Sequence, residues 1–329
     1  MGRAGAYRRS ALGVLSGTGS TLRVAVVGCG HFGRLHAAKW SDQPETRLAA
    51  VCDIDAARAQ VLAGSLGTRA ETDAERLIGA VDAVSVAVPT AAHFAVAGPL
   101  LDAGIHCLIE KPLAATVDEA ADLERRAVAA GAVLQVGHLE RFNPAFAAAL
   151  PLVGRPLFVE GHRLTPFRGR GTDVDVVLDL LVHDLDLLAL LVGETPSHVD
   201  AVGVPVLSAH DDMVSVRLRF PGGCTANLTA SRVSLKQERK LRIFGKDAYV
   251  AIDLGAGSVT VARRIGAETP HIVAERIEAG QGDPLRDEIA AFAAAVCSGG
   301  PPAVSAADGR RALELALRVS SELRRPSTP

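Results

Sequence analysis

The stretch that decides the fold is residues 22–33, which read Leu-Arg-Val-Ala-Val-Val-Gly-Cys-Gly-His-Phe-Gly. A short apolar run ends in a G-x-G-x-x-G turn at Gly28, Gly30 and Gly33, and a helix-like run follows. In such a turn the first glycine permits the tight bend, the second lets the backbone approach a pyrophosphate, and the third lets helix and strand pack closely. The N-terminus of the following helix offers amide donors to phosphates. The stretch therefore predicts a Rossmann domain that holds a dinucleotide.

Asp53 indicates which dinucleotide this turn binds. It ends the second predicted strand, 25 residues after Gly28, which is close to the spacing of the acid that binds the adenosine ribose. A carboxylate there accepts hydrogen bonds from both ribose hydroxyls and repels a 2′-phosphate, so NAD is the expected cofactor. Arg58, one helical turn further on, could weaken the preference over NADP. The structural alternative is that Asp53 only caps the helix that begins near Ala56. His31 and Phe32, inside the turn, are expected to contact the cofactor.

Around this stretch the first half alternates apolar strands with amphipathic helices, which predicts a parallel sheet covered on both faces. The second half has one strongly apolar helix over 174–192, then successive strands without intervening helices, and two closing helices. The predicted fold is thus an α/β Rossmann domain plus an α+β domain with a mostly antiparallel open sheet. The predicted boundaries are a flexible tail over 1–21, an NAD-binding domain over 22–142, and a substrate-binding and oligomerisation domain over 143–329, whose last helix could pack back on the Rossmann domain.

Composition excludes several classes of protein. The chain has 329 residues, a net charge of −2 and 48% hydrophobic residues, which suits a globular protein of two domains and gives no electrostatic case for nucleic acid or an anionic membrane. The five cysteines are scattered, which predicts free thiols in a reducing cytoplasm. The most apolar helix carries three aspartates and a histidine, so it is not expected to span a membrane.

Three segments follow predicted strands of the Rossmann domain, where ligands of such sheets bind. The first supplies Val88, Pro89, Thr90 and His93 as expected cofactor contacts, the second Glu110 and Lys111, and the third runs over residues 137–144. A lysine directly after a buried strand can be desolvated, which lowers its pKa and suits it to proton transfer. A solvated surface charge is the structural alternative for Lys111.

The apolar helix over 173–192 carries a second group of ionisable residues. At about 100° per residue, Asp175, Asp179, His183 and Asp186 fall on one stripe of a helix that is otherwise mostly Leu and Val. Buried charges are costly unless they are paired or functional. Asp179 could orient His183 as a base for a substrate hydroxyl, or the group could be a paired network in the core. Their spacing would suit a metal, but no third ligand is evident and none is expected.

These motifs resemble the Gfo/Idh/MocA (glucose–fructose oxidoreductase / inositol dehydrogenase) family. The glycine turn, Glu110-Lys111-Pro112, the Asp179 and His183 pair and the segment 308–313 occur in the family's order and spacing. The resemblance implies oxidation of a sugar or cyclitol hydroxyl, with Lys111 and His183 as acid/base pair and Asp179 holding the substrate. Leu181 departs from the glycine that the family commonly has there.

Three further segments, 137–144, 179–184 and 231–244, resemble a subgroup that oxidises the 3-hydroxyl of UDP-N-acetylglucosamine in lipid A biosynthesis. A diphosphate requires cations, and arginine binds phosphate well. The open alternatives are a dehydrogenase of myo-inositol, a free sugar or a UDP-sugar uronate, and a non-catalytic dinucleotide sensor. The open sheet further predicts a homodimer or homotetramer. The expected substrate-binding residues are Arg141, Asn143, Arg163, Arg168, Arg170, Asp179, His183 and Arg232.

Overall fold

The computed structural model describes residues 21–167, 175–266 and 271–323. The described chain divides into two compact units, one of residues 21–139 and 283–310 and the other of residues 140–282 and 311–323. The predicted tail over 1–21 lies, except for Thr21, outside the described residues. No helix in the described part of the chain is long and apolar enough to cross a membrane.

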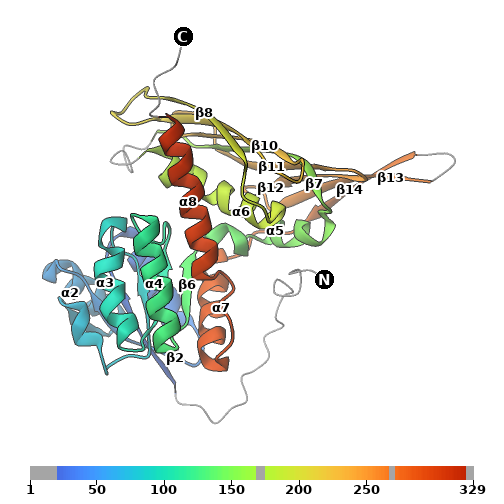
Figure 1. The fold of residues 1–329 in the computed structure, drawn as a ribbon. Coiled ribbons are helices and arrows are strands. Elements are labelled where there is room, and N and C mark those ends of the chain that lie inside the picture. The colour runs from blue at the N-terminus through green and yellow to red at the C-terminus, as the bar shows by residue number, and fades with distance from the viewer. Residues whose placement is uncertain (1–20, 168–174, 267–270, 324–329) are drawn as a thin grey trace. The chain divides into compact units, whose positions relative to one another are not determined.

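The first unit is built on a parallel sheet of six strands in the order β3-β2-β1-β4-β5-β6 (Figure 1). Val27 of β1 pairs with Cys52 of β2 and with Val86 of β4, so these strands end together at one edge. Strand order reverses at β1, which is where doubly wound sheets bind dinucleotides. The predicted Rossmann fold is confirmed, although β3 was not expected. The strands are β1 (Leu22–Val27), β2 (Thr46–Cys52), β3 (Arg69–Glu71), β4 (Ala83–Val86), β5 (His106–Glu110) and β6 (Leu134–Gly137).

Helices connect these strands, and local sequence sets their ends. Thr116 and Glu119 form a capping box at the start of α4, and Gly131 ends that helix in the left-handed conformation. Because crossovers between parallel strands are right-handed, α1 and α2 lie on one face of the sheet and α3 and α4 on the other. The elements are α1 (His31–Asp42), α2 (Ala56–Leu66), the 3₁₀ turn η2 (Ala74–Leu77), α3 (Thr90–Asp102) and α4 (Val117–Ala130).

A segment from far along the chain completes the first unit. Helix α7 (Pro284–Ser298) buries Ile289 and Phe292 in the same core cluster as Trp40 of α1, and the Trp40 and Phe292 rings meet edge to face. Residues 283–310 therefore belong to the Rossmann unit, whereas the sequence placed them in the second domain. A helix that fills a gap on a distant sheet leaves no local signal of its destination, because its apolar stripe would suit either core.

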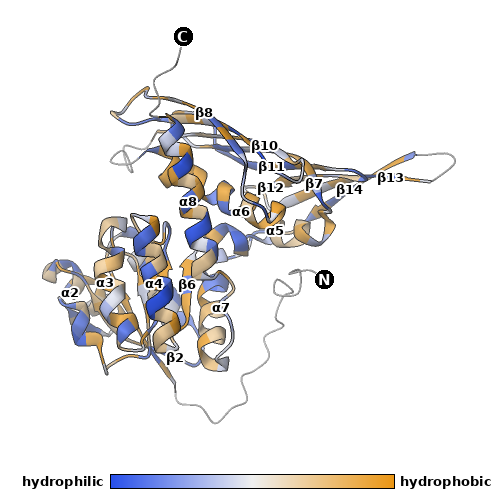
Figure 2. Ribbon diagram, in the orientation of Figure 1, coloured by the Kyte–Doolittle hydropathy of each residue, from blue (hydrophilic) through white to orange (hydrophobic). Residues whose placement is uncertain are grey.

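The second unit contains a sheet of eight strands in the order β14-β13-β12-β11-β7-β10-β9-β8. It is mostly antiparallel, as predicted, but β7 and β10 pair in parallel. Figure 2 shows hydrophilic and hydrophobic residues alternating along these strands, as expected of a sheet with one covered face. The strands are β7 (Pro156–Leu164), β8 (His198–Val204), β9 (Met213–Arg219), β10 (Thr225–Ser231), β11 (Glu238–Gly245), β12 (Ala248–Asp253), β13 (Ser258–Ile265) and β14 (His271–Glu278).

Helices cover one face of this sheet and close its core. Phe146, Leu185 and Val319, from three different helices, share a buried cluster with strand residues such as Leu228 and Ile243. The 3₁₀ turns η3 (Leu139–Phe142) and η4 (Leu150–Leu152) flank the first of these helices. The helical elements are α5 (Pro144–Ala149), the π-helical turn η5 (Val177–Leu181), α6 (Val182–Val192) and α8 (Ala306–Leu323), of which residues 311–323 belong to this unit.

Candidate active site

The glycine turn has the geometry that a dinucleotide requires. Gly28 has φ +95°, and a side chain there would meet the Ala87 carbonyl at 2.5 Å. A Cβ on Gly33 would lie 1.6 Å from the Gly28 carbonyl oxygen, so helix and strand touch through this pair. A Cβ on Gly30 would meet nothing within 4 Å. Gly28 and Gly33 are thus required for packing, whereas Gly30 keeps an approach to the backbone open.

Helix α1 begins directly at this opening. Its N-cap is Gly30, which makes no side-chain hydrogen bond to the first turn, so the first amide groups have no capping side chain. Such a helix end attracts anions through its free donors and its dipole. His31 and Phe32 form the first turn of the helix, and both are exposed. The residues present therefore fit a pyrophosphate at this place.

Asp53 has the position expected of the ribose-binding acid. It is 7% exposed, and its two carboxylate oxygens accept hydrogen bonds from the Cys29 amide at 2.7 Å and the Asp55 amide at 2.9 Å. The residue that caps α2 is Asp55, which accepts from the Arg58 amide. The cap alternative for Asp53 is therefore wrong. The Arg58 guanidinium lies 3.5 Å from both carboxylates.

Two strand ends of the sheet are tied together by His93. Its ring nitrogens lie 2.9 Å from the Val88 carbonyl oxygen and 3.0 Å from the Pro112 carbonyl oxygen, and the side chain is 1% exposed. Burial lowers the pKa of His93, and the contacts to these carbonyl oxygens oppose that effect. His93 thus holds the Pro89–Thr90 loop against the segment that follows Lys111. These contacts give His93 a structural role.

Lys111 follows Glu110, the last residue of β5, as predicted from the sequence. The Lys111 amide donates to a Glu110 carboxylate oxygen at 3.3 Å, and the other oxygen lies 2.8 Å from Nε2 of His36 on α1. Burial raises the pKa of Glu110, but the hydrogen bond and charge of His36 and the charge of Lys111 lower it further, so it stays below its ordinary value. An ionised Glu110 therefore accompanies Lys111.

In the second unit, the predicted helix with the ionisable stripe contains a π-helical turn. This turn, η5, includes Asp179, and His183 follows in the first turn of α6. π-Helical turns insert one residue into the helical repeat and occur often at functional sites. Asp175 accepts hydrogen bonds from the amides of Val177 and Leu178 and therefore begins the described helix. The predicted start over 173–174 lies outside the described residues.

Asp186 on this helix pairs with Arg141 of η3, as expected of the alternative in which the ionisable group is a paired network in the core. Asp184, which the sequence analysis did not single out, pairs with Arg163 of β7 at 2.7 and 2.9 Å. Across the π-helical turn a regular repeat of 3.6 residues does not apply. Leu181, where the family commonly has glycine, is fully buried in the core cluster.

Arg163 and Glu140 extend this pairing into a network. Arg163 Nη1 donates to Glu140 at 2.7 Å, and Arg239 lies 3.3 Å from the same oxygen. Burial raises the pKa of Glu140, but the Arg163 and Arg239 cations lower it below its ordinary value. Asn143 caps α5 and donates to Glu140 and to the Leu254 carbonyl.

The arginines expected to bind a diphosphate are therefore mostly engaged within the unit. Arg141, Arg163 and Arg232 are each at most 5% exposed, and Arg232 pairs with the fully buried Asp212 at 2.8 Å. A phosphate would have to compete with a buried carboxylate for each of these guanidinium groups. Arg168 and Arg170 lie outside the described residues. Sequence reasoning missed Asp184 and Asp212 as partners. For Asp184 a signal was present, because an unexplained acid on an apolar helix indicates buried pairing.

The fold and the dinucleotide turn define an NAD-binding oxidoreductase. Residues 22–138 match the family model described as an oxidoreductase family with an NAD-binding Rossmann fold, GFO_IDH_MocA, and residues 152–251 match the C-terminal domain of that family. The chain therefore belongs to the Gfo/Idh/MocA family of NAD-binding oxidoreductases, as the resemblance predicted.

Individual relatives cover at least nine tenths of the chain. It is 39% identical over 302 residues to UDP-N-acetylglucosamine 3-dehydrogenase of Acidithiobacillus ferrooxidans, covering 91% of this chain and 96% of that protein. A solved structure of that enzyme superimposes with a TM-score of 0.86 at 38% identity, covering 92% of this chain and 97% of the other. An inositol 2-dehydrogenase of Rhizobium meliloti is 29% identical over 90% of this chain and 95% of that protein.

Proposed function

We propose that the chain is an NAD-dependent sugar-nucleotide dehydrogenase that oxidises the 3-hydroxyl of UDP-N-acetylglucosamine to a ketone. The observation that carries the proposal is the 39% identity to an enzyme named for this reaction, over almost the whole of both chains. The site supports it, because the anion-binding turn at Gly30 and the ionisable residues Lys111, Asp179 and His183 are all present. Lipid A biosynthesis is the pathway that we propose for the product, and a cytoplasmic location stays a prediction from the free cysteines.

Oxidation of an alcohol removes a hydride from carbon and a proton from oxygen. Bound NAD supplies the hydride acceptor, and the glycine turn, Asp53 and the Val88–Thr90 loop would hold it. The chain itself must take the proton, and we assign this to Lys111 or His183, with Asp179 orienting the imidazole. Ionised Glu110 favours the ammonium form of Lys111 after proton transfer.

Binding of the diphosphate by Arg141, Arg163, Arg168, Arg170 and Arg232 belongs to this proposal. The buried pairs give three of these arginines a structural role. Arg141 and Arg163 hold η3 and β7 to acids of helix α6, and Arg232, directly after β10, is held to Asp212 before β9. Replacing any of these three would therefore change stability as well as affinity for the substrate. Their contribution to binding is separable only in variants whose folding is measured alongside.

A substrate comparison tests the function. Reduction of NAD is followed at the NADH absorbance with UDP-N-acetylglucosamine, a UDP-sugar uronate, a free sugar and myo-inositol. We expect turnover on UDP-N-acetylglucosamine to exceed the others; activity on myo-inositol alone would overturn the substrate. Lys111→Ala should abolish turnover and keep NAD binding. A non-catalytic dinucleotide sensor would show no turnover with any of these compounds before the substitution.

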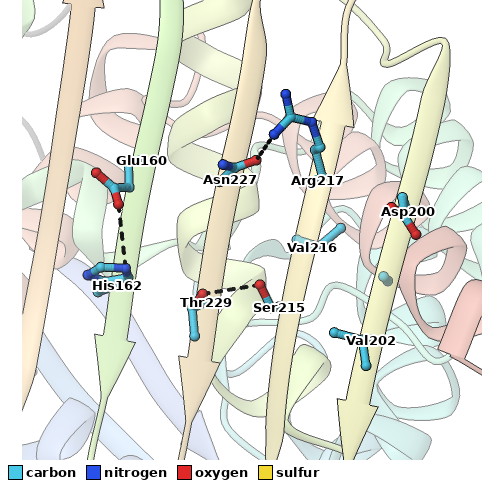
Figure 3. A pocket seen from close by; sticks show the side chains of 10 residues that line it. Glu160, His162, Asp200, Val202, Ser215, Val216, Arg217, Asn227 and Thr229 are labelled. Atoms are coloured by element: carbon cyan, nitrogen blue, oxygen red, sulfur yellow. Dashed lines mark hydrogen bonds and ion pairs between the residues drawn. The ribbon is translucent and has the colours of Figure 1, made fainter.

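Assembly through the eight-stranded sheet is a separate part of the proposal. Helices α5, α6 and α8 pack on one face, and most residues of the other face are at least partly exposed. Figure 3 shows polar side chains of four adjacent strands on this open face, among them His162, Asn227 and Arg217. On the same side the Phe244 ring contacts the rings of Phe158 and Tyr249, with centroid distances of 5.7 and 4.9 Å and a tilt of 50° in both pairs. A second copy that covers this face would bury these rings.

The oligomeric state is measured by light scattering coupled to gel filtration. We expect a dimer or tetramer for the wild type and a smaller species for Phe244→Glu, which places a charge among the three rings. The matched variant Ile54→Glu alters an apolar residue that is 96% exposed on the Rossmann unit, and it should keep the wild-type mass. A monomeric wild type would overturn the proposed assembly through the eight-stranded sheet.

A further inference from the structure

A buried cluster of three ionisable groups lies behind Lys111. It consists of His36 on α1, Glu110 at the end of β5, and Glu288 on α7. One ring nitrogen of His36 and one carboxylate oxygen of each glutamate all lie within 4.8 Å of one another. His36 is 1% exposed and Glu288 is fully buried. Three segments that are far apart in sequence therefore meet at one point of the Rossmann unit. The packing of α7 on this unit is what brings Glu288 there.

Within this cluster only one strong hydrogen bond is made. Nε2 of His36 donates to Glu110 at 2.8 Å. Both carboxyl oxygens of Glu288 are buried and have no hydrogen-bond partner in the described part of the chain. An ionised carboxylate in that state would carry the full cost of desolvation, which amounts to several kcal/mol. Carrying a proton removes most of that cost.

The neighbours of Glu288 favour the protonated form as well. Glu110 is the anion nearest to it, and burial together with the Glu110 charge raises the pKa of Glu288 well above its ordinary value. On β6 the contact to α7 is made by the uncharged Gln135, and buried His138 follows that strand. Lys39 on α1 is paired with Asp283, the N-cap residue of α7, at 2.5 Å.

A shared metal ion fits this geometry less well. Ligand atoms around a tetrahedral zinc, at bond lengths of about 2.0–2.1 Å, lie roughly 3.3 Å apart. The His36 and Glu110 atoms are 2.8 Å apart, which is a hydrogen-bond distance. A proton therefore accounts for the observed contact, and a metal would have to push these two groups apart.

The cluster also determines where the Glu110 carboxylate lies. A Cβ on Gly137, the last residue of β6, would lie 3.2 Å from the Glu110 carboxyl carbon, so the carboxylate occupies the space over that glycine. His36 holds it from the helix that begins at the dinucleotide turn. A second negative charge at Glu288 would repel it from this position.

We propose that Glu288 is a positioning residue for the lysine site: a buried carboxylic acid that keeps its proton at neutral pH, so that Glu110 is the single anion held by His36 beside Lys111. The consequence for catalysis rests on the proposed function of Lys111, whereas the protonation of Glu288 does not.

The protonation is tested by measuring unfolding of full-length wild type and Glu288→Gln from pH 5 to 9. A folded-state pKa above the unfolded value of about 4.3 means that the native protein binds an extra proton. Wild-type stability then falls as the pH rises from the unfolded to the folded pKa, and the variant lacks this loss. The unfolding constant of the wild type, divided by that of the variant, should therefore rise with pH, by up to about tenfold per pH unit.

The controls separate this effect from a loss of packing. Glu75→Gln, an exposed acid of the same unit, should give a ratio that does not change with pH. Glu288→Asp keeps an acid and should keep the wild-type slope, which also provides a second variant if Glu288→Gln does not fold. A pH-independent ratio for Glu288→Gln overturns the proposal. So does a stoichiometric metal ion in the purified wild type that Glu288→Gln loses.

The positioning role is tested by the pH profile of kcat. We expect the alkaline decline of the wild type to move to higher pH in Glu288→Gln, because no second anion can form beside Glu110. Coincident alkaline limbs overturn the link to Lys111. If the chain turns over none of the sugars, the proposed function fails, and the unfolding experiment still decides the state of Glu288.

Discussion

Gly33 touches Gly28 so closely that a Cβ on Gly33 would lie 1.6 Å from the Gly28 carbonyl oxygen, while Gly30 between them faces open space. The two glycines therefore serve different purposes, and alanine should separate them. Gly33→Ala must displace α1 from β1, at a cost of about 3 kcal/mol, the upper end for overpacking, with a melting temperature lower by ~6–12 °C. Gly30→Ala should change stability by less than ~1 kcal/mol and raise the Kd for NAD at least about tenfold.

Both variants are checked by calorimetry and by titration of NADH fluorescence. Gly104→Ala is a control for strain alone, because Gly104 has φ +78° but no neighbour within 4 Å and lies outside the turn. It should lower stability and leave the Kd unchanged. Equal effects of Gly30→Ala and Gly104→Ala on NAD binding would contradict an opening for the pyrophosphate at Gly30.

Asp53 should determine the choice between NAD and NADP. Asp53→Asn keeps one acceptor for the Cys29 or Asp55 amide but removes the charge that repels a 2′-phosphate, and Arg58 lies 3.5 Å away. We expect the ratio of the Kd for NADP to the Kd for NAD to fall at least about tenfold, or ~1.4 kcal/mol. Asp55→Asn is the matched control, since asparagine caps a helix as well as aspartate does. An unchanged ratio in Asp53→Asn would show that another residue discriminates the two cofactors.

How far the sequence predicts this structure is clearest by comparing two strands. Strand β1 is continuous in apolar residues and ends in a turn whose glycines have fixed spacing, so fold, cofactor and position follow from local pattern. Strand β7 was not predicted, although it lies in the middle of the second sheet. Its covered face carries Gly161 and Arg163 in place of large apolar residues, so period-two hydrophobicity is lost.

Gly161 and Arg163 also show why the pairing of the site residues was only partly predicted. A Cβ on Gly161 would meet Leu228 at 2.6 Å, and Arg163 is neutralised by Asp184. Neither requirement is visible without knowing which strand lies beside which helix. Lys111, by contrast, needed only its place after a buried strand. Residues whose position depends on their own element were predictable, and residues whose position depends on a distant partner were not.

The Arg163 and Asp184 pair should be among the costliest to break. Asp184→Asn leaves a fully buried guanidinium with only Glu140 as its anion, which should lower stability by about 3 kcal/mol, as for other buried pairs that lose one partner. Asp247→Asn, an exposed acid in the turn between β11 and β12, should stay within ~0.5 kcal/mol of the wild type. Denaturant unfolding followed by circular dichroism measures both. A loss below ~1 kcal/mol in Asp184→Asn would mean that Glu140 alone compensates Arg163.

Asp212 should make the second unit sensitive to acid. Burial raises the pKa of this carboxyl, but the Leu207 amide, the Ser208 hydroxyl and Arg232 lower it further, to well below its ordinary value. Because the folded pKa lies below the unfolded value of about 3.9, the native ionised form contributes stability above that pH, and the contribution is lost as the pH falls through the folded pKa. The difference in unfolding free energy between wild type and Asp212→Asn should be largest at neutral pH and shrink below about pH 4. Unfolding followed from pH 7 to pH 2 measures it, with Asp247→Asn again as the exposed control. A difference that stays constant over this range would show that Asp212 contributes through packing and not through its charge.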